Sequence, residues 1–123
     1  MTYIDHNSPQ IESIGTIGLC FGGWVGLHHA SHNYTKVKAT ASCHPSYHVE
    51  DNYGSLEDLI EKVDTPMLIC PAGDDRENTK PGGMIEKSFL DRGIPIEITE
   101  FKGDWLKIQF LPSFLQYFLY PYL

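Results

Sequence analysis

Short apolar runs alternate along the chain with segments whose apolar positions suit a helix. Four runs have the length and composition of strands: residues 12–19, 36–43, 66–72 and 94–101. Three segments between them predict helices: residues 22–33, 56–62 and 81–92. Nearly continuous apolar strands that alternate with helices are typical of a parallel sheet buried by those helices. The pattern therefore predicts an α/β fold with a mainly parallel sheet flanked by helices.

Local signals mark the ends of the predicted elements. Ser55 precedes the second helix and Asp58 follows three residues later, which is the spacing of a capping box. Gly93 is expected to stop the third helix. Residues 44–54 are predicted as a loop and residues 73–78 as a polar turn. Both follow predicted strands, at the carboxyl ends where parallel sheets carry their functional groups.

Composition limits the classes of function. The chain has 123 residues, of which 41% are hydrophobic, so it is long enough for one domain with a modest core. Nine basic residues against 16 acidic ones give a formal net charge of -7. Nucleic-acid binding needs a basic face, and anionic membranes attract basic segments, so we expect neither nucleic acid nor a membrane as a partner.

The cysteines and the N-terminal residues indicate a compartment. Cys20, Cys43 and Cys70 are an odd number without the spacing of a disulfide framework, so we expect reduced thiols and a cytoplasmic protein. The first residues are polar and lack the apolar stretch of a signal peptide. No segment reaches the ~20 apolar residues of a membrane span. Cys70 lies within an apolar run and is expected in the core.

The segment Gly18–Gly22 has the form G-x-C-x-G at the junction of the first predicted strand and helix. This form is typical of a nucleophile elbow, here with a thiol in place of a hydroxyl. Both glycines are expected to prevent collisions with the adjoining backbone while the turn aims Cys20 out of the sheet. The N–H of Phe21 is then expected to stabilise an oxyanion. A buried structural thiol and a phosphate cradle remain alternative interpretations.

Asp75 follows the third predicted strand, in the turn at residues 73–78. A carboxylate in this place suits the acid of a triad whose members follow in the order nucleophile, acid and histidine. The order of Cys20 and Asp75 therefore favours the nucleophile interpretation of the cysteine.

Four segments carry a family resemblance: "IGLCFGGWVGLHHA" (17–30), "SCHPS" (42–46), "TPMLICPAGDDREN" (65–78) and "IPIEITEFKG" (94–103). They resemble the dienelactone hydrolase family, a branch of the α/β-hydrolases that uses cysteine. The resemblance implies a partial domain of this type over residues 1–103 and hydrolysis of an ester or lactone. It implies that Cys20 attacks the carbonyl, that a histidine moves the proton and that Asp75 orients this histidine. No organic or metal cofactor is implied.

The sequence departs from this family at both ends. The family carries its histidine after the segment that ends here at Gly103, but the last of the six histidines is His48. Residues 104–123 form a divergent hydrophobic tail rich in aromatic side chains. The family also has strands before the elbow, for which the few residues before it leave no room. We therefore expect an incomplete α/β-hydrolase fold that self-associates through an uncovered sheet edge.

These departures leave two functions open. One is a hydrolase of the dienelactone hydrolase type that acts on a small-molecule ester or lactone through Cys20. The other is a catalytically inactive fragment or splice product of such a hydrolase, which acts through protein interaction if it acts at all.

Other polar side chains have predicted roles near the site. Arg76 is a candidate for binding a substrate carboxylate, with a solvated turn residue as its alternative, and His44 is a candidate for bordering the substrate. Two groups have side chains of the metal-ligating type: His28 with His32, and Cys43 with His44 and His48. The first group has no third ligand and Pro45 interrupts the second, so no metal site is expected.

Overall fold

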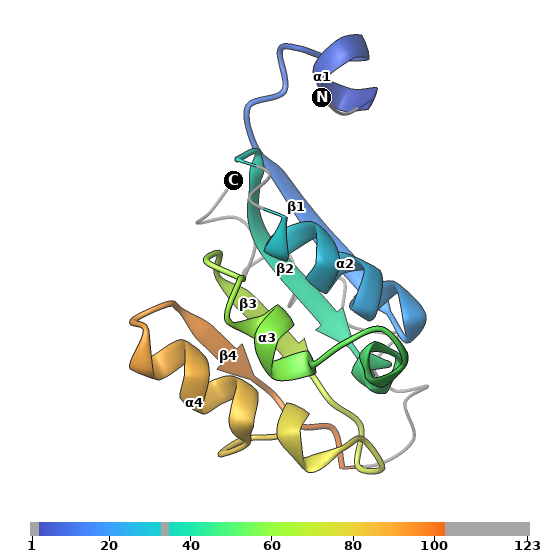
Figure 1. Ribbon diagram of the computed structural model, residues 1–123, viewed down its shortest axis with the longest axis vertical. Coiled ribbons are helices and arrows are strands. Elements are labelled where there is room, and N and C mark those ends of the chain that lie inside the picture. The colour runs from blue at the N-terminus through green and yellow to red at the C-terminus, as the bar shows by residue number, and fades with distance from the viewer. Residues whose placement is uncertain (1–2, 33–34, 103–123) are drawn as a thin grey trace.

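The computed structural model describes residues 3–32 and 35–102, which form a parallel sheet and the helices that pack on it (Figure 1). The sheet has four strands in the order β1-β2-β3-β4, and all three neighbouring pairs are parallel. The strands are β1 (Ile14–Leu19), β2 (Val37–Cys43), β3 (Met67–Cys70) and β4 (Ile96–Ile98). The predicted α/β fold with a parallel sheet is confirmed.

Helices follow each of the first three strands. They are α2 (Phe21–Ser31), α3 (Leu56–Ile60) and α4 (Met84–Asp91), with two short 3₁₀ helices η1 (Tyr47–Asn52) and η2 (Glu77–Thr79) beside them. Figure 1 shows α2, α3 and α4 in front of the sheet, so that these three helices share one of its faces. A short helix α1 (Tyr3–Asn7), which the hydrophobic pattern does not predict, lies apart from the sheet and buries no side chain.

Two hydrophobic clusters form on β3. Met67 and Ile69 pack with the apolar side chains of α2, α3 and α4 in the larger cluster. Leu68 and Cys70 belong to a second cluster together with side chains of β2. Because successive side chains of a strand point to opposite faces, the two clusters lie on opposite faces of the sheet. Continuous burial of β3 explains why its sequence is apolar at every position.

The predicted ends of the helices are close to the observed ones. The Ser55 hydroxyl caps α3 by accepting a hydrogen bond from the Asp58 N–H at 3.3 Å, as the spacing predicts. Helix α4 begins at Met84, later than predicted, because Gly82 has a φ of 78° that a helix does not accommodate. Gly93 ends α4 with a φ of 71°, as expected.

The loop predicted over residues 44–54 is more ordered in its backbone than the polar sequence indicates. It contains the 3₁₀ helix η1, whose Tyr47 side chain is buried and donates a hydrogen bond from its hydroxyl to Ser42 Oγ at 2.8 Å. Burial raises the pKa of Tyr47 well above its ordinary range, so the phenol stays protonated and keeps donating. This bond ties η1 to β2.

One edge of the described sheet is formed by β1, which pairs with β2 alone. Ile17 and Leu19 on this strand are 53% and 51% exposed. The predicted tail over residues 104–123 lies outside the described residues, so the division of the chain at residue 103 stays a prediction. Within residues 3–32 and 35–102, no helix has both the length and the apolar character needed to cross a membrane.

The turn from β1 into α2 brings two stretches of backbone together. A Cβ atom added to Gly18 would lie 2.2 Å from the carbonyl oxygen of Gly22, a distance that no side chain tolerates. A Cβ atom on Gly22 would meet nothing within 4 Å. The expectation that both glycines prevent collisions is therefore right for Gly18 and wrong for Gly22, because the close approach is between the Gly18 Cα and the Gly22 backbone.

We predict that Gly18→Ala lowers the free energy of unfolding by about 3 kcal/mol or more, since the backbone of α2 must move to admit the methyl group. The matched control is Gly22→Ala, which changes the free energy of unfolding by no more than about 1 kcal/mol, because a helical alanine replaces a helical glycine in open space. Urea denaturation followed by circular dichroism measures both. Equal effects of the two substitutions would contradict the prediction.

Candidate active site

Cys20 occupies the corner between β1 and α2 in a strained backbone conformation. Its φ is 50° and its ψ is -117°, a combination that L-residues rarely adopt. Three hydrogen bonds hold this conformation: its N–H donates to Cys43 O, and its carbonyl accepts from the N–H groups of Gly23 and Ser46, each at 3.0 Å. The geometry is that of the predicted nucleophile elbow, and the thiol is partly exposed.

Phe21 begins α2 directly after the cysteine. The first N–H groups of a helix have no acceptor within the helix, because the carbonyls four residues earlier lie outside it. The Phe21 N–H therefore points from the helix end next to the Cys20 side chain. This placement suits the predicted oxyanion donor.

Asp75 lies in the turn after β3, where its side chain is only 9% exposed. Its Oδ2 accepts a hydrogen bond from the Ala72 N–H at 2.7 Å, and its own N–H donates to Ala72 O at 3.1 Å. These bonds fix the carboxylate against the end of the strand. The neighbouring Asp74 is exposed, so the geometry favours Asp75 as the buried acid of the pair.

His44 contacts this carboxylate. Its Nδ1 lies 3.0 Å from Asp75 Oδ1, within ion-pair distance, and its side chain is 25% exposed. The residue follows β2 with a φ of 47°, and its N–H donates to Cys70 O at 2.9 Å. The sequence places His44 near the substrate, but the contact with Asp75 is not foreseen. The signal that points to it is the position of "SCHPS" after the strand between the elbow and the acid.

The register of the sheet brings the site residues to one edge. Leu19 pairs with Cys43, and Cys43 pairs with Cys70. Cys20 and His44 directly follow the first of these pairs, so their backbones lie side by side on strands about 4.8 Å apart. The carboxyl ends of β1, β2 and β3 thus present a thiol, an imidazole and a carboxylate in spatial order.

The other two cysteines are not part of the candidate site. Cys43 and Cys70 are buried free thiols in the second hydrophobic cluster. A hydrogen bond with Cys43, together with burial, raises the pKa of Cys70 far above its ordinary range. Cys70 is therefore an inert core thiol, as its apolar surroundings in the sequence predict.

Arg76 lies beyond Asp75 on the surface. Its Nη1 lies 2.7 Å from Asp51 Oδ2, and both side chains are more than half exposed. The pair joins the turn after β3 to η1, and its exposure makes its contribution to stability small. Within the described residues the guanidinium is thus already matched by a carboxylate.

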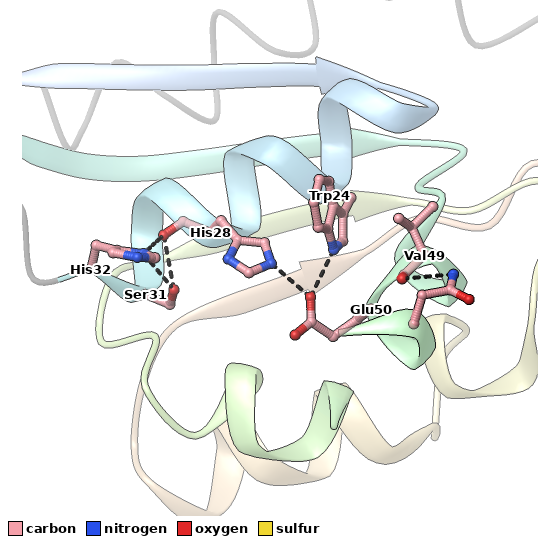
Figure 2. Close-up of polar contacts among 7 residues, drawn as sticks. Trp24, His28, Ser31, His32, Val49 and Glu50 are labelled. Atoms are coloured by element: carbon pink, nitrogen blue, oxygen red, sulfur yellow. Dashed lines mark hydrogen bonds and ion pairs between the residues drawn. The ribbon is translucent and has the colours of Figure 1, made fainter. Parts of the chain in front are cut away.

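A second polar cluster connects α2 with η1 and consists of Trp24, His28 and Glu50 (Figure 2). The Glu50 side chain is 7% exposed, and its Oε2 accepts a hydrogen bond from Trp24 Nε1 at 2.8 Å. The same oxygen lies 2.6 Å from His28 Nε2. Figure 2 shows both rings projecting from α2 toward the carboxylate. The cluster therefore fastens the elbow helix to η1.

This cluster explains the paired histidines of α2 without a metal. His28 contacts Glu50, while the His32 ring bonds to the His28 carbonyl group one turn earlier. No group of three histidine, cysteine, aspartate or glutamate side chains in residues 3–32 and 35–102 has the arrangement of a metal site. A cavity of about 400 Å³ opens beside the cluster, bounded in part by Tyr53 and Lys62.

Comparison with known proteins identifies the family that the chain matches. The model of the dienelactone hydrolase family matches residues 1–104. A comparison with curated protein sequences gives no match.

The solved structures that are similar to the chain include the following three. The acylaminoacyl peptidase of Pyrococcus horikoshii is 20% identical with a TM-score of 0.64, over 82% of this chain and 21% of the peptidase. A dienelactone hydrolase from Anabaena variabilis is 17% identical with a TM-score of 0.66, over 98% of this chain and 55% of that one. The enol-lactonase from Burkholderia xenovorans is 12% identical with a TM-score of 0.57, over 90% of this chain and 66% of the enol-lactonase.

These similarities establish the α/β-hydrolase fold. The chain spans about a fifth of the length of the peptidase and just over half of that of the dienelactone hydrolase.

We predict that Glu50→Ala lowers the free energy of unfolding by about 2–3 kcal/mol, because the substitution leaves the Trp24 N–H and the His28 ring without their acceptor. His48→Ala is the matched control on η1, since His48 is exposed, and its effect stays within about 0.5 kcal/mol. Thermal unfolding of the two variants beside the parent chain measures the difference. A Glu50→Ala chain as stable as the control would show that the cluster contributes nothing.

Proposed function

Because the chain belongs to the dienelactone hydrolase family, we propose that it hydrolyses a carboxylic ester or lactone with Cys20 as the nucleophile. The observation that carries this proposal is the strained backbone of Cys20, with its φ of 50° at the junction of β1 and α2. A structural thiol needs no such conformation, whereas a nucleophile that must stand clear of the sheet does.

The reaction follows from the groups at the sheet edge. The Cys20 sulfur attacks the carbonyl carbon, and the Phe21 N–H stabilises the oxyanion that forms. Asp75 orients the imidazole that moves the proton. Water then releases the acid from the thioester, so the proposed reaction uses no metal and no organic cofactor.

The small-molecule substrate is the remaining part of this proposal. An Arg76 side chain that exchanges Asp51 for a substrate would bind a carboxylate on that substrate, which suits a lactone acid. The net charge of -7 and the free thiols are consistent with a cytoplasmic enzyme that binds neither nucleic acid nor membranes.

A second candidate is an inactive relative that acts through protein contacts, including contacts with its own copies. The observation that favours it is the exposure of Ile17 and Leu19 on β1, the edge strand of the described sheet. Concentration-dependent association without turnover would support this candidate.

We predict that the purified chain hydrolyses p-nitrophenyl acetate and a dienelactone, and that Cys20→Ala reduces the rate to that of the buffer. Mass spectrometry of the acid-quenched reaction with p-nitrophenyl acetate is expected to find the acetyl group on the peptide that contains Cys20. The control is Cys20→Ala with an unchanged circular dichroism spectrum. Turnover retained in that variant would contradict the nucleophile, and absence of turnover in the folded parent would favour the inactive relative.

A further inference from the structure

We propose that His44, which follows β2, is the general base of Cys20. The inference rests on the proposed function and adds the residue that moves the proton. Three observations carry it: the position of His44 beside Cys20, the approach of its ring to Asp75, and the strained backbone on which it is held.

The first observation is that His44 lies between the other two groups. Cys20 follows β1, His44 follows β2 and Asp75 lies in the turn after β3, and β2 is the strand between β1 and β3. The Cys20 N–H donates to the carbonyl of Cys43, the residue just before His44. The backbones of the thiol and the imidazole are therefore direct neighbours across the sheet.

The second observation is the direction of the imidazole. Nδ1 lies 3.0 Å from Asp75 Oδ1, on the β3 side of the residue. The two nitrogens of an imidazole point away from each other, so we infer that Nε2 faces away from Asp75 and is the nitrogen that serves Cys20. A carboxylate on the Nδ1 side of the ring is the arrangement in which Nε2 moves the proton in a triad.

The third observation is that the chain around His44 is clamped to the elbow. His44 has a φ of 47°, which is positive like that of Cys20. Two bonds fix its loop: His44 N–H donates to Cys70 O at 2.9 Å, and Ser46 N–H donates to Cys20 O at 3.0 Å. Strained residues of this kind persist where the surroundings over-determine them, which is common at active sites.

The remaining histidines are placed elsewhere. All six lie within the described residues, and among these His44 is the one with an ion-pair contact to Asp75. The others are His28, which contacts Glu50, together with His6 on α1, His29 and His32 at the end of α2, and His48 on η1. Their positions leave the carboxyl edge of the sheet to His44.

The proposed step balances within the site. The Sγ–H proton passes to Nε2 of His44, and the sulfur forms a bond with the carbonyl carbon. When the oxyanion collapses, the C–O bond to the leaving oxygen breaks and that oxygen takes the proton from Nε2. Water next gives a proton to Nε2 while its oxygen attacks the thioester carbon. The C–S bond breaks, the acid leaves, and the sulfur recovers its proton from Nε2.

The variant that tests this step is His44→Asn. Asparagine tolerates a positive φ, and its side-chain amide occupies the place of Nδ1 beside Asp75, while nothing replaces Nε2. We expect the variant to fold and to lose about 10²–10⁴-fold in kcat for p-nitrophenyl acetate. His48→Asn on the neighbouring η1 is the matched control and is expected to keep the parent rate.

Two further readouts separate a base from a structural role. We expect His44→Gly to recover part of its turnover on addition of imidazole, because the free base then enters the vacated space. We also expect the rate at which iodoacetamide alkylates Cys20 at pH 7 to fall about tenfold or more in His44→Asn, since the proposed acceptor of the thiol proton is then absent. Asp75→Asn combined with His44→Asn is expected to be no slower than His44→Asn alone.

The outcomes distinguish this inference from the proposed function. Cys20-dependent turnover that persists in folded His44→Asn overturns the inference and leaves the function standing. Absence of turnover in the folded parent overturns the function, and alkylation then decides the inference by itself. Equal alkylation rates in the parent and in His44→Asn would overturn the pairing of His44 with Cys20, whereas a slower rate in the variant supports it.

Discussion

The close approach of two backbone segments at the start of α2 is the constraint on which the site depends. Gly18 lies so near the carbonyl of Gly22 that a methyl group between them has no room. This approach lets the chain turn from the edge strand β1 into a helix within a single residue, and that residue is Cys20. The packing of α2 on β1 thus sets the strained backbone conformation of Cys20. The position of its sulfur follows from that conformation.

The loop after β2 is tied to the same turn between β1 and α2. The elbow carbonyl accepts the N–H of Ser46, and Glu50 in η1 binds Trp24 and His28 on the elbow helix. The turn into α2 and the loop after β2 are therefore joined at two places. One is the main-chain hydrogen bond of Ser46, and the other is the side chain of Glu50. This arrangement holds the groups of the edge with main-chain bonds and leaves less to flexible side chains.

Much of this arrangement could be predicted from the sequence. Apolar runs gave the four strands, and the glycines around Cys20 gave the elbow, because both depend on local patterns. The contact between His44 and Asp75 was not predicted, since it depends on the order of the strands and on a positive φ at His44, and the place of "SCHPS" after the middle strand indicates it only once that order is known. The role of Glu50 was missed for the same reason: its partners lie on a different helix.

The central position of β2 has an evolutionary consequence. The thiol, the imidazole and the carboxylate all come from residues 20–75, within one unit of three adjacent parallel strands. If this unit holds the whole proton path, selection on the chain after residue 75 is relaxed for chemistry and remains only for packing. Substitutions after residue 75 are then expected to disturb the reaction less than substitutions within residues 20–75.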